Sequence, residues 1–163
     1  MVDRETGSYW WQLAGRSIVG DLDGELLTVL PAETTTWESW LERNPDTLVM
    51  DQPFGRSYAQ DSFLGIGVSL DEGRTPFPVD PGAFQDRRLR PSARVIVVET
   101  GDDRKAYVTA PARTIEDTIG GTEVTVTTDG VGATAEGPDG PLPTRFSYWY
   151  AAVATYPGID LGT

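Results

Sequence analysis

The sequence predicts a mainly β fold, a β-rich α+β protein with two short aromatic helices. The chain of 163 residues holds 18 Gly and 12 Pro, which is typical of a protein with many turns. Short runs of Val, Ile and Thr lie between these turns, as in strands. Two aromatic segments follow Ser or Thr and end at Pro, which indicates helices of about two turns. A chain of this length can bury one core, so we expect a single domain over residues 1–163.

The stretch from residue 3 to residue 20 places two adjacent Trp residues behind a polar turn, Thr6-Gly7-Ser8, and ahead of a short apolar run. If this stretch forms a strand, Trp10 and Trp11 point to opposite faces. One of them can then anchor the core while the other lies on the surface or in a pocket. The sequence favours a packed strand with one half-exposed aromatic side chain, and a Trp that faces a ligand is the alternative.

The next two expected elements are a strand over Glu25–Leu30 and a short helix. Trp37 and Trp40 lie at helical spacing, and Thr35 with Glu38 fits a capping box. A helix of about two turns does not persist alone. We therefore expect both Trp side chains to pin it onto the sheet, and an exposed pair that stacks on a sugar is the alternative.

Residues 51–91 are rich in Pro and Gly and show no sustained period, which predicts a long connection, an ordered strap that lies on the domain. After it, the runs Arg94–Glu99 and Lys105–Thr109 predict a hairpin. Residues 115–121 are expected to turn into Thr122–Thr127, whose alternation predicts a strand with one wet face.

A second aromatic helix is expected over Tyr148–Tyr156, with Ser147 as its N-cap. It is apolar nearly all round, which predicts burial between layers or coverage by a partner. The pattern around it matches an earlier one at a constant offset: Leu30-Pro31, Trp37, Leu41 and Pro45 recur as Leu142-Pro143, Trp149, Val153 and Pro157. We therefore predict two unequal pseudo-repeats, residues 1–50 and 92–163, packed as one domain.

The charge of the chain excludes two classes of partner. Thirteen basic against 25 acidic residues give a net charge of −12. Nucleic acids and anionic membranes need clustered Lys and Arg, so we expect neither as a partner. No apolar run approaches the length of about 18 residues that spans a membrane, and the N-terminus lacks the features of a signal peptide. We expect no membrane insertion and, as encoded, a cytoplasmic protein, with a protein partner or a homo-oligomer left open.

The balance of charged residue types predicts a halophilic source. Lys105 is the single Lys against twelve Arg, and 15 of the acids are Asp. Salt screens the self-repulsion of such an acidic surface, while a GC-rich genome is the alternative explanation for the missing Lys. We expect the midpoint of thermal unfolding to rise between about 0.1 M and about 2 M KCl. A midpoint that stays flat or falls over this range contradicts the halophilic origin.

The sequence contains no Cys and no His, which excludes self-contained thiol, His-metal and Ser-His-Asp mechanisms. Asp21, Asp23 and Glu25 suggest a calcium loop, but Leu26 and Ala32 stand where an EF-hand has its Gly and its Glu. We therefore expect no metal and no cofactor.

Two function hypotheses follow from the remaining residues. In the first, the protein is a non-catalytic module that binds a ligand or a partner chain. Its expected binding residues are Asp3, Arg4, Thr6, Ser8, Trp10 and Arg16. Arg4 suits a carboxylate or phosphate, and Trp10 suits a stacking wall. In the second, the protein is a carboxylate-dependent hydrolase that acts on a glycan. Its acid pair would come from Asp3, Glu5, Glu116 and Asp117.

Several motifs of the chain occur in one order: Asp3-Arg4, Thr6-Gly7-Ser8, Gly15-Arg16, Ile18-Val19-Gly20, Trp37 to Trp40, Ala93–Val98, Glu116–Gly121 and Tyr148–Ala152. In this order they resemble bacterial and archaeal proteins of the domain of unknown function 3179 family, over nearly the whole chain. The resemblance implies common ancestry but no reaction, because the activity of that family is not established.

The chain departs from the longer members of this family. They resemble it only in their second half, and their first half carries a Cys-x-x-Cys element with a nearby His, which suits metal or redox chemistry. This chain has neither residue type, and Met1 stands where the family has an internal apolar residue. A truncated remnant of a longer family member is therefore a third hypothesis.

Overall fold

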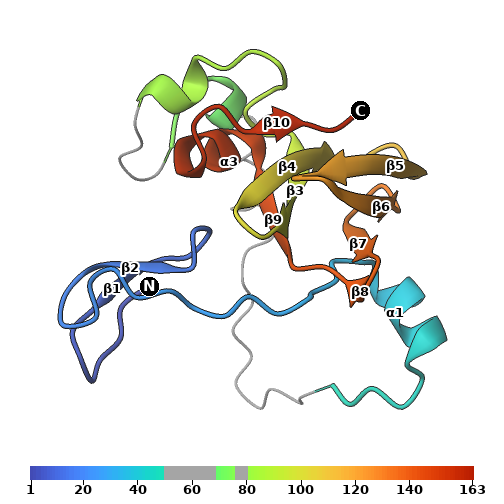
Figure 1. Cartoon of the computed structure of the whole chain (residues 1–163), viewed down its shortest axis with the longest axis horizontal. Helices are drawn as coiled ribbons and strands as arrows, with labels where there is room; N and C mark the ends of the chain where they lie inside the picture. The colour runs from blue at the N-terminus through green and yellow to red at the C-terminus, as the bar shows by residue number, and fades with distance from the viewer. Residues whose placement is uncertain (50–68, 76–80) are drawn as a thin grey trace.

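A four-stranded sheet forms the centre of the computed structural model, which describes residues 1–49, 69–75 and 81–163. Its strands lie in the order β10-β4-β3-β9, with β9 at one edge (Figure 1). The strands are β3 Arg94–Thr100, β4 Asp103–Val108, β9 Thr144–Tyr148 and β10 Asp160–Leu161. β3 and β4 confirm the predicted hairpin. β9 runs antiparallel to β3, whereas β10 runs parallel to β4.

The two faces of this central sheet bury two different hydrophobic clusters. Alternate residues of a strand point to opposite faces. Ile96 and Val98 therefore join a cluster shared with a second sheet, while Val95 and Val97 join a cluster shared with a helix. All four side chains are at most 1% exposed, so β3 is the most deeply buried strand of the central sheet.

The second sheet has the order β5-β6-β7-β8 and covers one face of the central sheet. Its strands are β5 Arg113–Ile119, β6 Thr122–Thr128, β7 Ala133–Gly137 and β8 Gly140–Pro141. The strand predicted over 122–127 is confirmed by β6. The turn expected over 115–121 is wrong, because only Gly120 and Gly121 turn, with φ of 55° and 82°. The residues between Ile115 and Ile119 are polar, so the sequence pattern does not indicate a strand there, although the strand β5 buries both Ile side chains.

The helix α3, Trp149–Thr155, covers the other face of the central sheet and confirms the second predicted helix. Its residues Trp149 and Ala152 are fully buried. The expected N-cap, Ser147, is wrong. The N-cap is Tyr148, which makes no capping bond with its side chain, and the Ser147 hydroxyl donates a hydrogen bond to the Tyr148 carbonyl oxygen. The helix is therefore held by burial rather than by capping.

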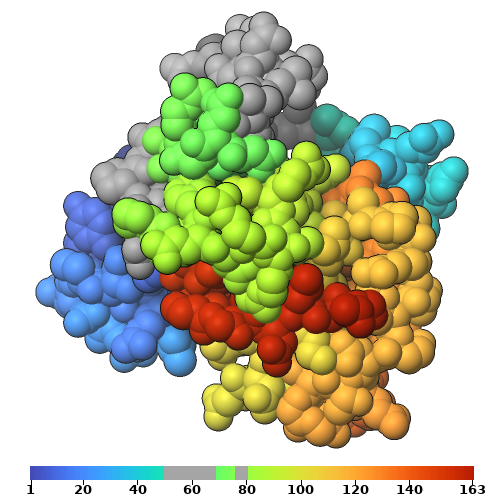
Figure 2. All heavy atoms as spheres, turned by 90° about the horizontal axis from the view of Figure 1, so that it is seen from above, coloured from blue at the N-terminus to red at the C-terminus, as the bar shows by residue number. Residues whose placement is uncertain are grey.

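The described end of the expected strap lies on α3. The short 3-10 helix η1, Pro81–Phe84, contacts α3, and the Phe84 ring stacks on Tyr150 with ring centroids 5.5 Å apart. Figure 2 shows this part of the chain packed directly on the C-terminal residues. The other strap residues, 51–68 and 76–80, lie outside the described residues.

A separate two-stranded sheet lies near the N-terminus, to one side of the other two sheets (Figure 1). It pairs β1, Tyr9–Trp11, with β2, Arg16–Val19. The strand expected over Glu25–Leu30 is wrong, because only Leu26 forms a β-bridge, to β2. Leu26 and Leu30 are each 71% exposed, so this apolar run finds no sheet to pack on.

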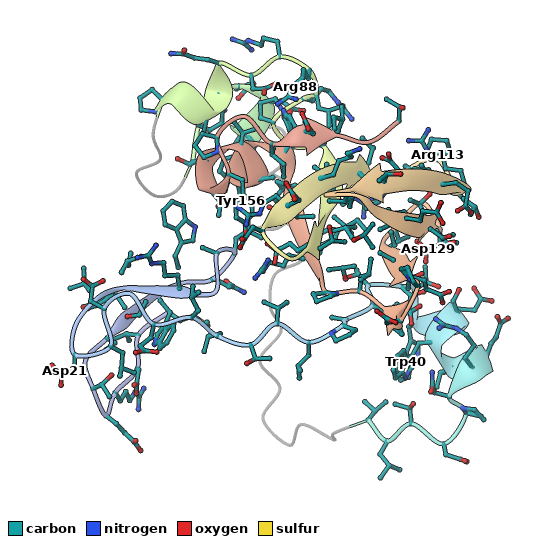
Figure 3. All side chains as sticks on the ribbon, viewed as in Figure 1. Asp21, Trp40, Arg88, Arg113, Asp129 and Tyr156 are labelled. Atoms are coloured by element: carbon teal, nitrogen blue, oxygen red, sulfur yellow. The ribbon has the colours of Figure 1, made fainter. Side chains whose placement is uncertain are left out.

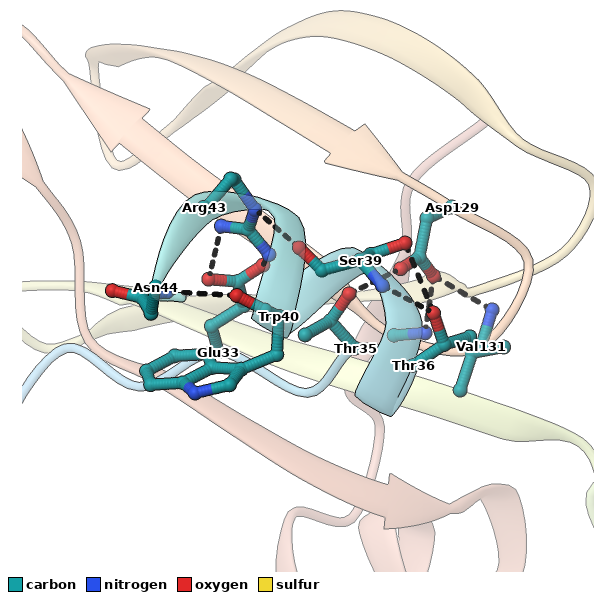
Figure 4. A network of polar contacts seen from close by, with 10 residues as sticks. Glu33, Thr35, Thr36, Ser39, Trp40, Arg43, Asn44, Asp129 and Val131 are labelled. Atoms are coloured by element: carbon teal, nitrogen blue, oxygen red, sulfur yellow. Dashed lines mark hydrogen bonds and ion pairs between the residues drawn. The ribbon is translucent and has the colours of Figure 1, made fainter. Parts of the chain in front are cut away.

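The helix α1, Trp37–Arg43, confirms the first predicted helix and differs in its cap. The N-cap is Thr36, whose hydroxyl oxygen accepts a hydrogen bond from a backbone N–H of the first turn. The expected capping box of Thr35 and Glu38 is therefore wrong. The Thr35 hydroxyl lies 3.1 Å from the Asp129 carboxylate instead, which ties the start of α1 to the end of β6 (Figure 4).

Polar contacts hold α1 in place. The Arg43 guanidinium donates two hydrogen bonds to the Glu33 carboxylate, one of them at 2.8 Å, as Figure 4 shows. The Trp40 indole N–H donates to the Thr47 hydroxyl at 2.8 Å. Trp37 is 52% exposed. The expectation that both Trp side chains pin the helix is therefore wrong for Trp37.

The structure confirms the mainly β class and does not show the two pseudo-repeats. α1 and α3 both span seven residues and both begin at Trp. Their surroundings differ, because α1 buries no residue while α3 buries three. In the described part of the chain, no helix is long and apolar enough to cross a membrane.

Candidate functional site

The polar turn before β1 brings three predicted binding residues together and uses them internally. The Thr6 hydroxyl lies 2.6 Å from the Asp3 carboxylate and 2.8 Å from the Ser8 hydroxyl. The Leu22 N–H donates to the same Ser8 hydroxyl at 3.0 Å, and Ser8 is fully buried. Hydrogen bonds from Thr6 and from the Glu5 N–H lower the pKa of Asp3. These groups satisfy one another, so their arrangement holds the turn closed.

The other three predicted residues lie apart from this network. Arg4 is exposed at the turn, and Trp10 is half-buried in β1. Arg16 lies on β2 and lines a pocket together with Trp11. Trp11, and not the predicted Trp10, lines this pocket, and Trp10 belongs to neither hydrophobic cluster.

We call this pocket, of about 530 Å³, the hairpin pocket. Its lining residues are Trp11, Ala14, Arg16, Ser17, Ile18, Asp23, Leu26, Arg104, Thr155 and Tyr156. They come from the β1–β2 hairpin, from the segment after it, from β4 and from the end of α3. The Tyr156 hydroxyl donates to the Leu13 carbonyl oxygen at 3.0 Å, which fixes the hairpin against α3. Figure 3 shows Tyr156 at this junction.

Arg104 of the hairpin pocket lies beside two further charged side chains, those of Glu99 and Arg145. Arg145 forms an ion pair with Glu99, and the Nε atom of Arg104 lies 3.6 Å from the same Glu99 carboxylate. The Arg104 guanidinium also stacks over the Tyr156 ring, 4.7 Å from its centroid. Burial raises the pKa of Tyr156. One carboxylate thus faces two guanidinium groups, which leaves an excess of positive charge.

A second pocket, of about 730 Å³, follows the edge of the central sheet, and we call it the edge groove. One wall is β9 together with Tyr150 and Ala151, and the other consists of residues from 11–15 and 27–32. Trp11 lines both the edge groove and the hairpin pocket. Arg145 is the only charged residue in the groove lining among the described residues.

The edge of β9 that faces the groove carries a free peptide unit. The Trp149 N–H donates to the Ala93 carbonyl oxygen at 2.8 Å, across the β3–β9 ladder. Residues of an antiparallel strand alternate between facing the partner strand and facing away. Ser147 and Arg145 therefore bond to β3, and the N–H and C=O groups of Phe146 point away from it. Within the described ranges, no residue forms a hydrogen bond to either group.

A cluster of polar side chains joins β4 to β5, and its members form hydrogen bonds with one another. The Lys105 ammonium lies 3.0 Å from both oxygens of Asp117, and the Tyr107 hydroxyl donates to Asp117 at 2.9 Å. Burial raises the pKa of Asp117, but the hydrogen bonds from Lys105, the Thr118 N–H and Tyr107 outweigh it and lower the pKa overall. Burial and the Asp117 contact raise the pKa of Tyr107. This cluster links the two sheets.

The acids of the hydrolase hypothesis form two pairs that lie apart from each other. Asp3 and Glu5 precede β1, and Glu116 and Asp117 lie in β5, at the opposite side of the molecule (Figure 1). Glu116 accepts a hydrogen bond from Thr125. The residues described by the structure contain no group of three or more acids placed to hold a metal ion.

The structure adds Arg104, Arg145 and Phe146 to the candidate residues. Nothing in the sequence marks them, because Arg104 stands beside a turn and the other two lie in a short, mixed strand. Their roles depend on which segments lie beside them. For Trp11 the sequence gives a partial signal, because the alternation in β1 predicts one Trp on the surface or in a pocket, although the predicted residue is Trp10.

Comparison with known proteins identifies the family. The model of the DUF3179 family, described as a protein of unknown function, matches residues 1–139. This range holds the N-terminal hairpin, α1 and the strands from β3 to β7, and it stops before β9 and α3. No curated protein and no solved structure matches the chain. The chain therefore belongs to the DUF3179 family of proteins of unknown function.

Proposed function

We propose that the protein is a non-catalytic binding module that takes an extended segment of a partner protein along the edge of β9. The observation that carries this proposal is the free peptide unit of Phe146 at the edge groove. An edge strand with unpaired N–H and C=O groups is a template for a further strand. Main-chain hydrogen bonds then supply affinity, and the walls of the groove select side chains.

The lining of the groove suits an apolar strand. Its walls include Leu13, Leu27, Leu30 and Phe146, and the last of these is 40% exposed. A bound strand would cover this apolar surface, which stabilises the complex. Residues 27–32 face β9 across the groove, so the space suits one strand better than the edge of a second sheet. This geometry favours a partner segment over a homo-oligomer.

The charge of the lining also bears on the choice of partner. The protein has a net charge of −12, yet the described lining of the groove holds no carboxylate and one guanidinium group, that of Arg145. A segment that is uncharged or mildly acidic can enter without facing a like charge at close range. A strongly basic segment would be drawn to the acidic surface outside the groove instead.

The variant Phe146→Pro tests the proposal, because it removes the outward N–H from the edge strand. Proline is tolerated on edge strands, so the fold is expected to remain. Short peptides are selected from a displayed random library on the wild-type protein, and their dissociation constants are measured by fluorescence anisotropy. We expect Phe146→Pro to weaken binding by about 10-fold or more, since a main-chain hydrogen bond is lost.

Phe146→Val is the matched control, because it changes the same side chain and keeps the peptide N–H. It should retain most of the affinity. Circular dichroism and unfolding midpoints check that both variants fold. The proposal fails if the selected peptides bind Phe146→Pro as well as the wild type, or if the library yields no peptide that protects the Phe146 amide from hydrogen exchange.

A further inference from the structure

We infer that the hairpin pocket binds a small anion that carries a carboxylate or phosphate group. The pocket is distinct from the edge groove, so this inference does not rest on the proposed function. Its main support is the Arg16 guanidinium, which lines the pocket and has no hydrogen-bond or ion-pair partner among the described residues. Arg16 is exposed, so its guanidinium is accessible to a ligand in the pocket.

The local charge balance points the same way. Arg16 and Arg104 line the pocket together with the Asp23 carboxylate, and Glu99 beside Arg104 already pairs with Arg145. The balance is one positive charge in excess, while the chain as a whole is strongly negative. Arg145 and Glu99 neutralise each other, so the excess charge lies on the Arg16 and Arg104 guanidinium groups of the pocket lining. An anion in the pocket would neutralise it.

The two pocket-lining Arg residues are held by different elements. Arg16 belongs to β2, and Arg104 belongs to β4 in the central sheet. The Arg104 guanidinium is restrained by its stacking on Tyr156 and by Glu99 at 3.6 Å from its Nε atom. Its Nη2 atom also donates a hydrogen bond to the Asp102 carbonyl oxygen. A planar guanidinium fork suits the paired oxygens of a carboxylate or phosphate. Two such forks on one pocket allow an oxyanion to bridge the hairpin and the central sheet.

The aromatic wall selects the rest of the ligand. Trp11 lines the pocket and is 43% exposed, and Ile18 and Leu26 line it as well. Large apolar side chains that stay exposed around charged groups are typical of sites for small organic ligands. An organic carboxylate with a flat apolar body would use both the Arg16 and Arg104 guanidinium groups and the Trp11 ring. Inorganic phosphate would use only the guanidinium groups.

The test is a titration of the full-length chain at constant ionic strength in chloride. The two probes are benzoate, which has a flat apolar body, and inorganic phosphate, which has none. Trp fluorescence and isothermal titration calorimetry report binding. We expect saturable binding of at least one probe with a dissociation constant below about 10 mM. Tighter binding of benzoate identifies an organic carboxylate as the natural ligand class, and tighter binding of phosphate identifies a phosphate group.

Two variants and one control locate the binding. Arg16→Gln and Arg104→Gln should each raise the dissociation constant of the bound probe by about 10-fold or more, because each removes a charged donor. Arg113→Gln is the control, since Arg113 is exposed on β5, at the far side of the molecule (Figure 3). It should leave the affinity unchanged. Binding that is equal in Arg16→Gln and Arg113→Gln overturns the inference, as does the absence of saturable binding of both probes to the wild type.

Two of these variants distinguish this inference from the proposed function. Phe146→Pro should leave the binding of the anion unchanged, and Arg16→Gln should leave the binding of the selected peptides unchanged. A variant that weakens both ligands equally shows one continuous site and contradicts the separation of pocket and groove.

Discussion

Replacing Trp149 with Ala is expected to lower the free energy of unfolding by about 3–5 kcal/mol. The Trp149 side chain is fully buried at the start of α3 and belongs to the cluster that contains Val95 and Val97. The Arg88 guanidinium stacks over its ring, 5.0 Å from the centroid. The loss of this side chain leaves a cavity between α3 and the central sheet. Urea unfolding at fixed salt concentration measures the change.

Trp37→Ala is the matched control for this prediction. Trp37 opens α1 as Trp149 opens α3, but its side chain is 52% exposed. We expect Trp37→Ala to change the free energy of unfolding by less than about 1 kcal/mol. Equal losses in the two variants would contradict the different burial of the two helices.

Replacing Asp117 with Ala is expected to cost about 2–4 kcal/mol. The change leaves the Lys105 ammonium and the Tyr107 hydroxyl without their shared partner at the junction of the two sheets. Breaking a buried ion pair costs about 3–5 kcal/mol, and the lower figure applies here because the two side chains of the pair keep 20% and 23% exposure. Glu116→Ala, at the exposed neighbouring position, should cost less than about 1 kcal/mol.

The pH dependence of unfolding tests the role of Asp117 separately. Its pKa in the folded protein lies below its value of about 3.9 in the unfolded chain. The carboxylate therefore contributes stability above about pH 4, and this contribution is lost as the pH falls through the folded-state pKa. We expect the wild type to lose more stability than Asp117→Ala between about pH 5 and pH 2. Parallel stability curves for the two proteins would show that the carboxylate does not contribute in this way.

The elements that the sequence predicts well are those whose local pattern agrees with their surroundings. The run Val95–Val98 is apolar without interruption, and it forms the buried strand β3. The apolar segment around Trp149 forms the buried helix α3. In both cases the burial that shapes the element is visible in its own residues, so periodicity and composition are sufficient.

The elements that the sequence misses depend on a neighbour. β5 alternates Ile with polar residues and becomes a strand because β6 pairs with it along its whole length. The run Glu25–Leu30 has the composition of a strand, but only Leu26 finds a partner. Strand propensity describes how a segment fits a sheet, and it cannot supply the sheet.

The candidate site was predictable only in part. The sequence indicates Arg16 and Trp10 as binding residues, and the hairpin pocket contains Arg16 but holds Trp11 in place of Trp10. Asp3, Thr6 and Ser8 have the residue types of a binding site and instead satisfy one another in a turn. A polar motif looks the same in a sequence whether its hydrogen bonds go to a ligand or to itself.

The sequence by itself determined the mainly β class, the helices α1 and α3, the family and the lack of imidazole and thiol side chains in this chain, because each of these follows from composition or from local order. The tertiary structure alone decided that Arg16 and Arg104 share a pocket and that Phe146 lies on an open edge. These properties depend on which distant segments become neighbours. That choice results from the packing of the whole core, and no single stretch of the chain encodes it.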